Sequence, residues 1–382
     1  MLSTPIFPPE IGGPATYTVE VARHLQGRGH KIRIVAFTDV RPQVENLEVI
    51  PVRIRYPILG TLLRQTKFFF TLLSSVKSMD LIYLQDPVVV GVASLLVGKL
   101  VRKPLVLKFV GDSIWEKEYS LRRTDKNLDD FLSSPQKSLK LKLRISLLRL
   151  ILGSMSRIIV PSFYLRDILI KHYGVKPDEI AVVYNSVDAK DMERPASSHK
   201  QENNKQIISI GRMVRHKRID GIITTLKEIC KKFPGTSLAL VGDGPERKPL
   251  ERLAENLGVA QSVRFYGSIE HERTLELLSE SDVFMLNSIY EGLPHTVIEA
   301  MNCSVPVVAT NICGTNEAID DGRTGLLVSP DNEEGFASQI GRLFEDRQLS
   351  EQLVKNALAA VAEKFSWENN LVKLETELEK AI

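Results

Sequence analysis

The sequence lacks the features that mark secreted, membrane-spanning and nucleic-acid-binding proteins. Its 382 residues include only three cysteines, too few and too scattered for a disulfide framework or a metal site, which favours a reducing cytosol. No apolar run reaches the roughly 18 residues of a membrane-spanning helix, and no signal peptide is recognised. Basic tracts and zinc-ligand spacings are missing too, so we expect no nucleic acid partner.

Acidic residues are scarce in the first half of the chain. Residues 1–185 hold 27 Lys and Arg against 16 Asp and Glu, a net charge of +11, whereas the remainder holds 23 against 31, or −8. This asymmetry indicates that the first half meets something anionic. A chain of this length is too long for one ordinary core and fits two domains.

Strand-like apolar runs alternate with helical patterns along most of the sequence. We expect strands at residues 31–37, 81–84, 105–110, 157–160, 207–210, 237–241, 263–266, 282–286 and 305–309. Such alternation predicts an α/β protein with two doubly wound, Rossmann-like domains facing a cleft, whose ligands bind at the carboxyl ends of the strands. The polar stretch 188–205 is the expected linker, which gives domains at 1–187 and 188–365. Residues 1–4 are too short for the buried strand that usually opens such a domain, so we expect that strand to be truncated.

Three glycine-containing turns follow predicted strands or precede helices. Gly12 and Gly13 precede an apolar helical stretch, where they form either a close approach to a ligand or simply a tight turn. Arg212 and Lys217 follow a strand and suit a polyphosphate, although basic surface loops are common. The sequence Val-Gly-Asp-Gly-Pro at 241–245 is half a dinucleotide fingerprint, which argues against a nicotinamide dehydrogenase.

The segment EGLPHTVIEAM at 291–301 sets two glutamates eight positions apart around the start of a predicted helix. Pro294 fits the first helical turn, and the amides of His295 and Thr296 would favour a phosphate at the positive end of that helix. Glu291 in the loop and Glu299 in the helix suit neutral hydroxyl groups. Phosphate and hydroxyl groups together are the chemistry of a sugar nucleotide.

This combination resembles the retaining glycosyltransferases of family 4, also called glycosyl transferases group 1, which have the GT-B fold. The resemblance rests on Glu291-x7-Glu299, Arg212, Lys217 and Gly12-Gly13, and it extends from residue 7 to residue 370. It implies a nucleotide-diphosphate sugar as donor substrate and no other cofactor. It also implies a last helix, at 366–382, that packs back on the first domain. No Asp-x-Asp triplet is present to hold a metal on the phosphates, so no metal is expected.

The resemblance also implies roles for individual residues. The expected donor-binding residues are Gly12, Gly13, Arg212, Lys217, Gly267, Ser268, Glu291, Gly292, Leu293, Pro294, His295, Thr296 and Glu299. In this set the two cations and the amides of Gly13, His295 and Thr296 would hold the diphosphate. Glu299 would bind the ribose, and residues 267–268 would lie near the base. Glu291 and the backbone of 292–295 would meet the transferred sugar.

Two positions depart from the family pattern. Many relatives carry a histidine after the strand at 106–110, where this chain has Gly111 and Asp112. Asp112 either takes part of that role near the sugar or caps the following turn, and both interpretations stay open. The catalytic candidates are therefore Glu291, Arg212, Lys217 and Asp112. The second departure is Pro294-His295, where relatives often have glycine and an aliphatic residue, so the His295 side chain could narrow the sugar pocket.

Two segments of the first half are basic and rich in leucine or phenylalanine. Residues 136–152 carry five basic residues and no acidic one, and residues 59–76 are similar. A basic amphipathic helix is typical of proteins that bind membrane surfaces, although ordinary helices packed around a core can have the same sequence pattern. We favour an anionic membrane surface or a lipid-linked acceptor, with a glycan or small-molecule acceptor as the alternative. The protein is then cytoplasmic or peripheral at the inner face of the membrane.

The predicted function is transfer of a sugar from a nucleotide-diphosphate sugar to an acceptor hydroxyl, with retention of anomeric configuration. A nucleotide-sugar-binding protein or partner subunit without turnover is the alternative, and Gly111 in place of histidine supports it. A GT-B epimerase or phosphorylase is disfavoured, because the length and a pyridoxal-type lysine context are missing.

Overall fold

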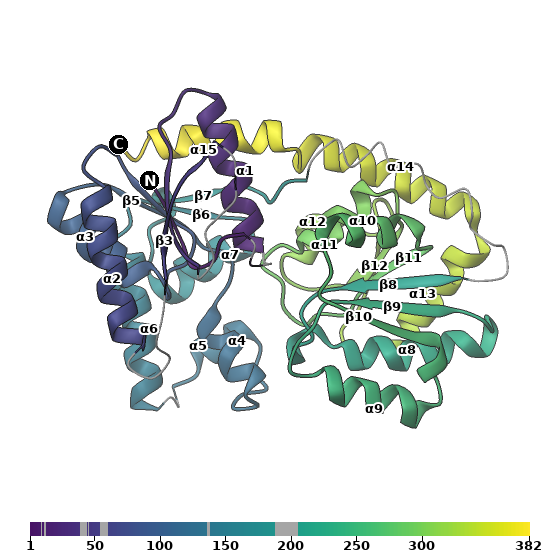
Figure 1. Cartoon of the computed structure of the whole chain (residues 1–382). Helices are drawn as coiled ribbons and strands as arrows, with labels where there is room; N and C mark the ends of the chain where they lie inside the picture. Colours follow the sequence, from purple (N-terminus) through teal and green to yellow (C-terminus); the bar gives the residue numbers. More distant parts are fainter. Residues whose placement is uncertain are drawn as a thin grey trace. The chain divides into compact units, whose positions relative to one another are not determined.

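The computed structural model describes residues 1–8, 10, 13–38, 44, 46–53, 60–135, 138–187 and 205–382 (Figure 1). Gly12 and most of the predicted linker, residues 188–204, lie outside these ranges. The chain divides into two compact units. Unit 1 comprises Met1–Ile114, Ser133–Val183 and Leu371–Ile382, and unit 2 comprises Trp115–Leu132 and Tyr184–Asn370. Unit 2 thus includes a segment, Trp115–Leu132, that the sequence analysis assigned to the first domain.

Unit 1 is built on a seven-stranded parallel sheet in the order β3-β2-β1-β4-β5-β6-β7. Its strands are β1 (Leu2–Thr4), β2 (Arg33–Phe37), β3 (Glu48–Val52), β4 (Ile82–Leu84), β5 (Leu105–Lys108), β6 (Arg157–Val160) and β7 (Ile180–Val182). The first four residues, expected to be too short for a buried strand, do form one. Leu2 pairs with Ile34 of β2 and with Tyr83 of β4, so hydrogen bonds on both sides support this short strand.

The helices of unit 1 form layers on both faces of the sheet. They are α1 (Gly13–Gly27), α2 (Gly60–Ser75), α3 (Gly91–Val101), α6 (Leu139–Leu152), α7 (Phe163–Ile168), a π-helical turn (Leu169–Tyr173) and most of α15 (Trp367–Glu379). The chain moves in one direction from β1 to β3 and in the other from β3 to β7. Right-handed crossovers therefore put α1 on one face and α2, α3 and α6 together on the other, as Figure 1 shows.

Unit 2 has a six-stranded parallel sheet in the order β10-β9-β8-β11-β12-β13. Its strands are β8 (Gln206–Ile210), β9 (Ser237–Val241), β10 (Val263–Gly267), β11 (Val283–Leu286), β12 (Val307–Thr310) and β13 (Leu326–Val328). Its helices are α4 (Ser113–Ser120, mostly), α5 (Leu128–Ser133, mostly), α8 (Ile219–Lys232), α9 (Arg247–Leu257), α10 (His271–Glu280), α11 (His295–Asn302), α12 (Thr315–Ala318), α13 (Glu333–Glu345) and α14 (Arg347–Lys364). Apolar clusters cover both faces of this sheet, with Phe284 and Phe336 fully buried.

The order of strands in unit 2 marks one place for a ligand. From β8 the chain continues outward to β9 and β10, and then returns to place β11 on the other side of β8. Ligands of open α/β sheets bind at such a switch point, outside the carboxyl ends of the two strands. The loops that follow β8 and β11 are therefore the first place to look for a site.

The helix α15 joins the last residues of the chain to unit 1. From Leu371 onward the chain belongs to unit 1, where Arg157 Nε donates a hydrogen bond to Glu377 Oε2 at 2.5 Å. The resemblance implied that the last helix packs back on the first domain, and the helical residues of 371–379 do lie in unit 1. Among the described residues, no helix has the length and apolar character needed to cross a membrane.

Candidate functional site

The loops after β8 and β11 are joined by hydrogen bonds at the switch point. The amide of Ile289 donates to the carbonyl of His216 at 2.9 Å. Lys217 Nζ then lies 2.6 Å from Glu291 Oε1, and Ser288 Oγ donates to the same oxygen at 2.6 Å. Glu291 is buried apart from about a tenth of its surface. The structure therefore brings together two residues that the sequence analysis selected from different motifs.

Two glycines let the loop after β9 pack against the loop that carries Arg212. A Cβ on Gly242 would lie 2.0 Å from the carbonyl oxygen of Gly211, and one on Gly244 would lie 2.4 Å from that of Met213. Both contacts are to backbone, which has no room to move aside. The Val-Gly-Asp-Gly-Pro sequence is thus explained by close packing of two loops beside the switch point.

Arg212, the other predicted phosphate ligand, has an exposed side chain and a carboxylate partner. Its Nη2 donates a hydrogen bond to Glu116 Oε2 at 3.0 Å, and 68% of the Arg212 side chain is exposed. Burial raises the pKa of Glu116, while Arg212 and Lys217 act to lower it and Glu291 acts to raise it. The Glu116 carboxylate therefore lies within electrostatic reach of both predicted phosphate cations. No motif in the sequence pointed to Glu116.

Aromatic side chains back this part of the site. The fully buried Trp115 packs with its ring centroid 4.8 Å from that of Tyr290 and 6.0 Å from that of His216. Burial, together with the charges of Lys217 and Arg212, lowers the pKa of His216 to about 3. The imidazole is therefore neutral near pH 7. It packs against Trp115 and does not add a positive charge to those of Arg212 and Lys217.

The N-terminus of helix α11, which is the positive end of the helix dipole, lies in the loop after β11 at the switch point. Pro294 is the residue before the helix, so the predicted start at Pro294 is one residue early, and α11 begins at His295. The Pro294 carbonyl accepts a hydrogen bond from the Val297 amide at 3.1 Å. The amides of the first turn, including that of Thr296, have no carbonyl one turn earlier in the helix, which is the arrangement that favours an anion.

Glu299 lies in the second turn of α11, and two histidines flank it. Its Oε1 is 3.1 Å from His295 Nδ1 and 3.8 Å from His271 Nδ1. Burial opposes ionisation of Glu299, but the charge and hydrogen bond of His295 and the charge of His271 lower its pKa below the usual range. Glu299 is therefore a carboxylate that can accept hydrogen bonds from hydroxyl groups. The side chain of His295 was predicted only to narrow a sugar pocket, whereas its amide was predicted to hold the diphosphate, and His271 was not predicted at all.

Three more of the predicted residues, Gly13, Gly267 and Ser268, lie at the start of α1 or at the end of β10. Gly267 ends β10, has a φ of +70°, and accepts a hydrogen bond from the Gly242 amide at 2.8 Å, and Ser268 next to it is exposed. Gly13 is the first residue of α1 in unit 1. Gly267 therefore lies at the carboxyl end of its strand, and contact of Gly13, Gly267 and Ser268 with a donor stays a prediction.

Asp112 lies in unit 1, and the structure shows the second of its two predicted roles. Its Oδ1 accepts a hydrogen bond from the Ile114 amide at 2.9 Å, which caps the start of α4, and Oδ2 accepts one from the Tyr173 hydroxyl. The side chain is fully buried. These contacts give Asp112 a structural role, and a contact with the sugar stays a prediction.

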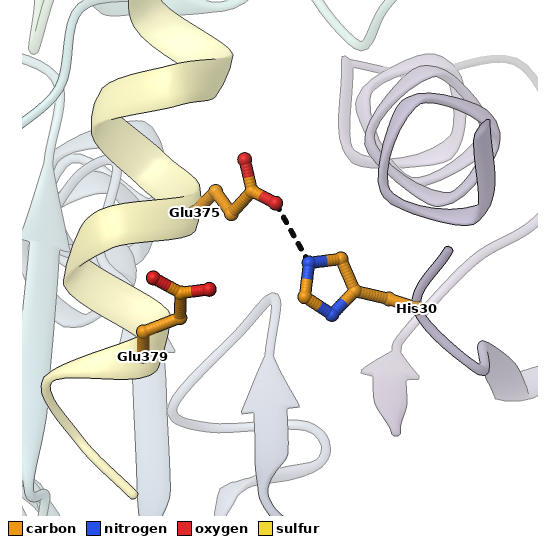
Figure 2. A group of neighbouring side chains, drawn as sticks. All are labelled: His30, Glu375 and Glu379. Atoms are coloured by element: carbon orange, nitrogen blue, oxygen red, sulfur yellow. Dashed lines mark hydrogen bonds and ion pairs between the residues drawn. The ribbon is translucent and has the colours of Figure 1, made fainter. Parts of the chain in front are cut away.

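One group among the described residues has the spacing of metal ligands. His30, Glu375 and Glu379 of unit 1 place ligand atoms within 4.8 Å of one another (Figure 2). Glu375 already contacts His30 Nε2 at 2.7 Å through one oxygen and Arg28 Nε at 2.5 Å through the other. An ion-pair cluster that holds α15 on unit 1 accounts for this group.

Comparisons with known proteins agree with the geometry. The model for Glycosyltransferase Family 4 matches residues 11–191, and the model for Glycosyl transferases group 1 matches residues 191–359. The uncharacterized glycosyltransferase MJ1607 of Methanocaldococcus jannaschii is 28% identical over 223 residues, which are 56% of this chain and 57% of the relative. N-acetyl-alpha-D-glucosaminyl L-malate synthase of Bacillus anthracis is 32% identical over 212 residues, which are 54% and 55% of the two chains.

The matches differ in how much of each protein they cover. The chain spans about half the length of the curated relatives it matches. The structure of Anabaena HepE in complex with UDP and glucose covers 99% of both chains, with a TM-score of 0.79 at 20% identity, and so has the same fold. The two family models together run from residue 11 to residue 359 and include every strand of the two sheets except β1. The chain therefore belongs to the glycosyltransferases of family 4 and group 1, which have the GT-B fold.

Proposed function

We propose that this chain transfers a sugar from a nucleoside-diphosphate sugar to an acceptor hydroxyl. Family membership supports a transferase, and the solved relative that binds UDP and glucose supports this type of donor. The observation that carries the proposal is the contact of Lys217 with Glu291 at 2.6 Å, at the switch point of unit 2. Lys217 suits a phosphate and Glu291 suits a sugar hydroxyl. Groups that can bind the two parts of a sugar nucleotide therefore lie in direct contact.

The donor diphosphate is held by cations and helix amides. Arg212 offers a planar fork, Lys217 a point charge, and the amides of His295 and Thr296 the positive end of α11. All of these stabilise the negative charge that grows on the leaving diphosphate as the bond to the sugar breaks. Glu299 is assigned to the ribose hydroxyls, because a carboxylate accepts hydrogen bonds from hydroxyl groups. Gly267 and Ser268 are assigned to the base.

The transfer proceeds with retention and without a protein nucleophile. The bond between the anomeric carbon and the diphosphate breaks with its electron pair going to the phosphate oxygen. The acceptor oxygen bonds to the same face of the carbon, and its proton passes to the departing diphosphate. Glu291, held at one oxygen by Lys217 and Ser288, keeps its place and orients the sugar. No divalent metal is needed, because fixed cations supply its charge.

The acceptor is assigned as lipid-linked or part of a cell-envelope glycan, used at the cytoplasmic face of a membrane. The net charge of +11 on residues 1–185 supports this assignment, because lipid phosphates and pyrophosphates are anionic.

Two measurements test the proposed function. Nucleoside-diphosphate sugars are screened by thermal shift, where a bound donor raises the melting temperature by mass action. The donor selected is then supplied with candidate acceptors, and NMR of the first-formed product gives its anomeric configuration. A product with inverted configuration contradicts the mechanism. A donor that binds but is never turned over, with lipid-linked and soluble acceptors alike, favours a binding protein instead.

A further inference from the structure

The outer surface of α6 is lined by leucines. Leu139, Leu143, Leu147 and Leu150 recur at helical spacing and are 75%, 62%, 46% and 57% exposed. Single exposed leucines are common on soluble proteins, but a continuous stripe of them marks a contact surface. From the sequence we expected a basic, leucine-rich amphipathic helix in this region. The structure shows that the leucines themselves form the exposed stripe.

Two neighbouring helices carry the same feature. On α3, Val92, Leu96 and Leu100 are spaced by four residues and are exposed. On α2, Leu63 and Phe70 are exposed and lie seven residues apart, on one side of the helix. The α3 stripe was not predicted from the sequence, because that helix is apolar on nearly all sides and has the pattern of a buried helix.

The three stripes belong to one helix layer. Gln65 Nε2 of α2 donates a hydrogen bond to the Val89 carbonyl at 2.7 Å, just before α3. At the start of α3, a Cβ on Gly91 would lie 3.5 Å from the side chain of Ile151 of α6. Figure 1 shows α2, α3 and α6 on the same side of the sheet of unit 1. We call the nine exposed side chains of these helices, from Leu63 to Leu150, the leucine face.

The charges on these helices are of one sign. α2, α3 and α6 contain seven Lys and Arg residues and no Asp or Glu. Among these, Lys67, Lys99, Lys140 and Lys142 have exposed side chains. A second copy of the chain docking through the same face would bring like charges together. An anionic lipid surface is complementary both to the basic residues and to the apolar ones.

We infer that the leucine face inserts into the boundary between headgroups and acyl chains of an anionic bilayer. This inference rests on the part of the proposed function that assigns the acceptor to a membrane, and it adds the surface of unit 1 that meets that membrane; it does not depend on the donor. It also differs from a purely electrostatic contact, because the part of the affinity that comes from buried leucines is not screened by salt. Unit 1 would thereby be held at the surface where a lipid-linked acceptor lies.

Vesicle flotation of the full chain tests the inference. The vesicles are pure phosphatidylcholine, or phosphatidylcholine with about a third phosphatidylglycerol, at about 0.1 M and about 0.5 M salt. We expect the protein to float with anionic vesicles at low salt and to keep a clear fraction bound at high salt. The double variant Leu143→Ser/Leu147→Ser should lose about tenfold in bound fraction under both conditions.

Two matched variants separate insertion from general effects. Val372→Ser alters a side chain of α15 that is 45% exposed, close to the 46% of Leu147, and should leave binding unchanged. Lys140→Gln/Lys142→Gln should weaken binding at low salt and have little effect at high salt. All of the altered side chains are exposed, so the melting temperature should stay within a few degrees of the parent, which confirms folding.

Three outcomes would overturn the inference. In the first, the parent chain stays with the soluble fraction at low salt. In the second, the double leucine variant floats as the parent does. In the third, size-exclusion chromatography with light scattering shows a dimer that the double leucine variant abolishes, which would assign the leucine face to contact between two copies. None of these results bears on donor binding, so failure here is distinguishable from failure of the proposed function.

Discussion

Arg212 Nη2 donates a hydrogen bond to Glu116 Oε2 at 3.0 Å, so one predicted phosphate ligand already has an anionic partner. Lys217, the other, is paired with Glu291 in the same way. A donor diphosphate that binds Arg212 has to displace the Glu116 carboxylate or share the guanidinium with it. Glu116 thus competes with the donor for Arg212 and sets part of the cost of donor binding.

Removing the charge of Glu116 should tighten binding of a nucleoside diphosphate. Glu116→Gln is expected to lower the Kd by about 1.4- to 5-fold, because partly exposed ion pairs are worth about 0.2–1 kcal/mol. Isothermal titration calorimetry with UDP, GDP and ADP measures the change. Glu246→Gln is the control: Glu246 pairs at 3.5 Å with Arg122, which lies in the same segment, 115–132, as Glu116, whereas the ion-pair partner of Arg212 among the described residues is Glu116. Weaker binding in Glu116→Gln would show that Glu116 supports the donor instead of competing with it.

Loss of the Arg212 guanidinium should weaken the same ligand. Arg212→Ala is expected to cost about 1.5–3 kcal/mol of binding free energy, the scale of a hydrogen bond to a charged group. Arg122→Ala, which removes a guanidinium from the segment next to the site, should have no effect. Unchanged affinity in both Arg212→Ala and Lys217→Ala would remove the assignment of these residues to the diphosphate.

Glu291→Gln should separate turnover from diphosphate affinity. We expect turnover to fall about a hundredfold, because a misplaced sugar can lose this much. The Kd for the nucleoside diphosphate should stay the same or decrease, because Lys217 loses an anionic competitor. Steady-state kinetics and calorimetry on one preparation measure both. A glycosyl ester trapped on Glu291 would instead make this residue a nucleophile.

Removal of divalent metal should leave transfer unchanged. The chain has no Asp-x-Asp triplet, and Arg212, Lys217 and the α11 terminus already place positive charge at the site. Initial rates are compared before and after dialysis against EDTA. Activity that disappears and returns with manganese would contradict this prediction.

Lys108 should make the stability of the chain depend on pH. This buried β5 residue lies 4.7 Å from the ring centroid of Tyr17, and burial lowers its pKa from 10.5 to about 7. Between these values the unfolded chain binds the proton and the folded chain releases it, so the free energy of unfolding should rise with pH. The expected slope is up to about 1.4 kcal/mol per pH unit.

Lys108→Met tests this prediction, because methionine fills similar space without a charge. The variant should be more stable than the parent at pH 7 and should lose much of the rise in stability between pH 7 and pH 9. Urea unfolding at the two pH values measures both effects. An unchanged slope in the variant would mean that other groups cause the pH dependence.

The sequence predicted the strands that carry several apolar residues and missed the short or mixed ones. β7 and β13 have three residues each, and β3 is an edge strand that contains Glu48 and Pro51. Such strands are too short or too mixed in composition for the alternation of apolar and polar residues to distinguish them from loops. They form because a neighbouring strand supplies hydrogen bonds. β1 is the extreme case, since pairing on both sides makes Leu2–Thr4 a central strand.

The candidate site was predictable where residues follow a strand closely. Arg212, Lys217 and Glu291 lie within seven residues of the ends of β8 and β11, so strand order alone brings them together. Glu116 was missed because it is 96 positions from its partner Arg212. It follows β5 of unit 1 in sequence, yet its segment belongs to unit 2. Sequence spacing gives no signal for such a contact.

The path of α15 limits how this chain can be recombined with its relatives. The helix begins in unit 2 and continues in unit 1 from Leu371. Earlier in the sequence, the chain passes from unit 1 to unit 2 at Trp115 and returns to unit 1 at Ser133. A chimera that exchanges only the residues after the polar stretch 188–205 would replace α15 as well. It would then separate Glu375 from its partners Arg28 and His30. Grafting a new donor specificity therefore requires a second junction near residue 370, and matched residues at 115–132 to preserve the pairs with Arg212 and Glu246.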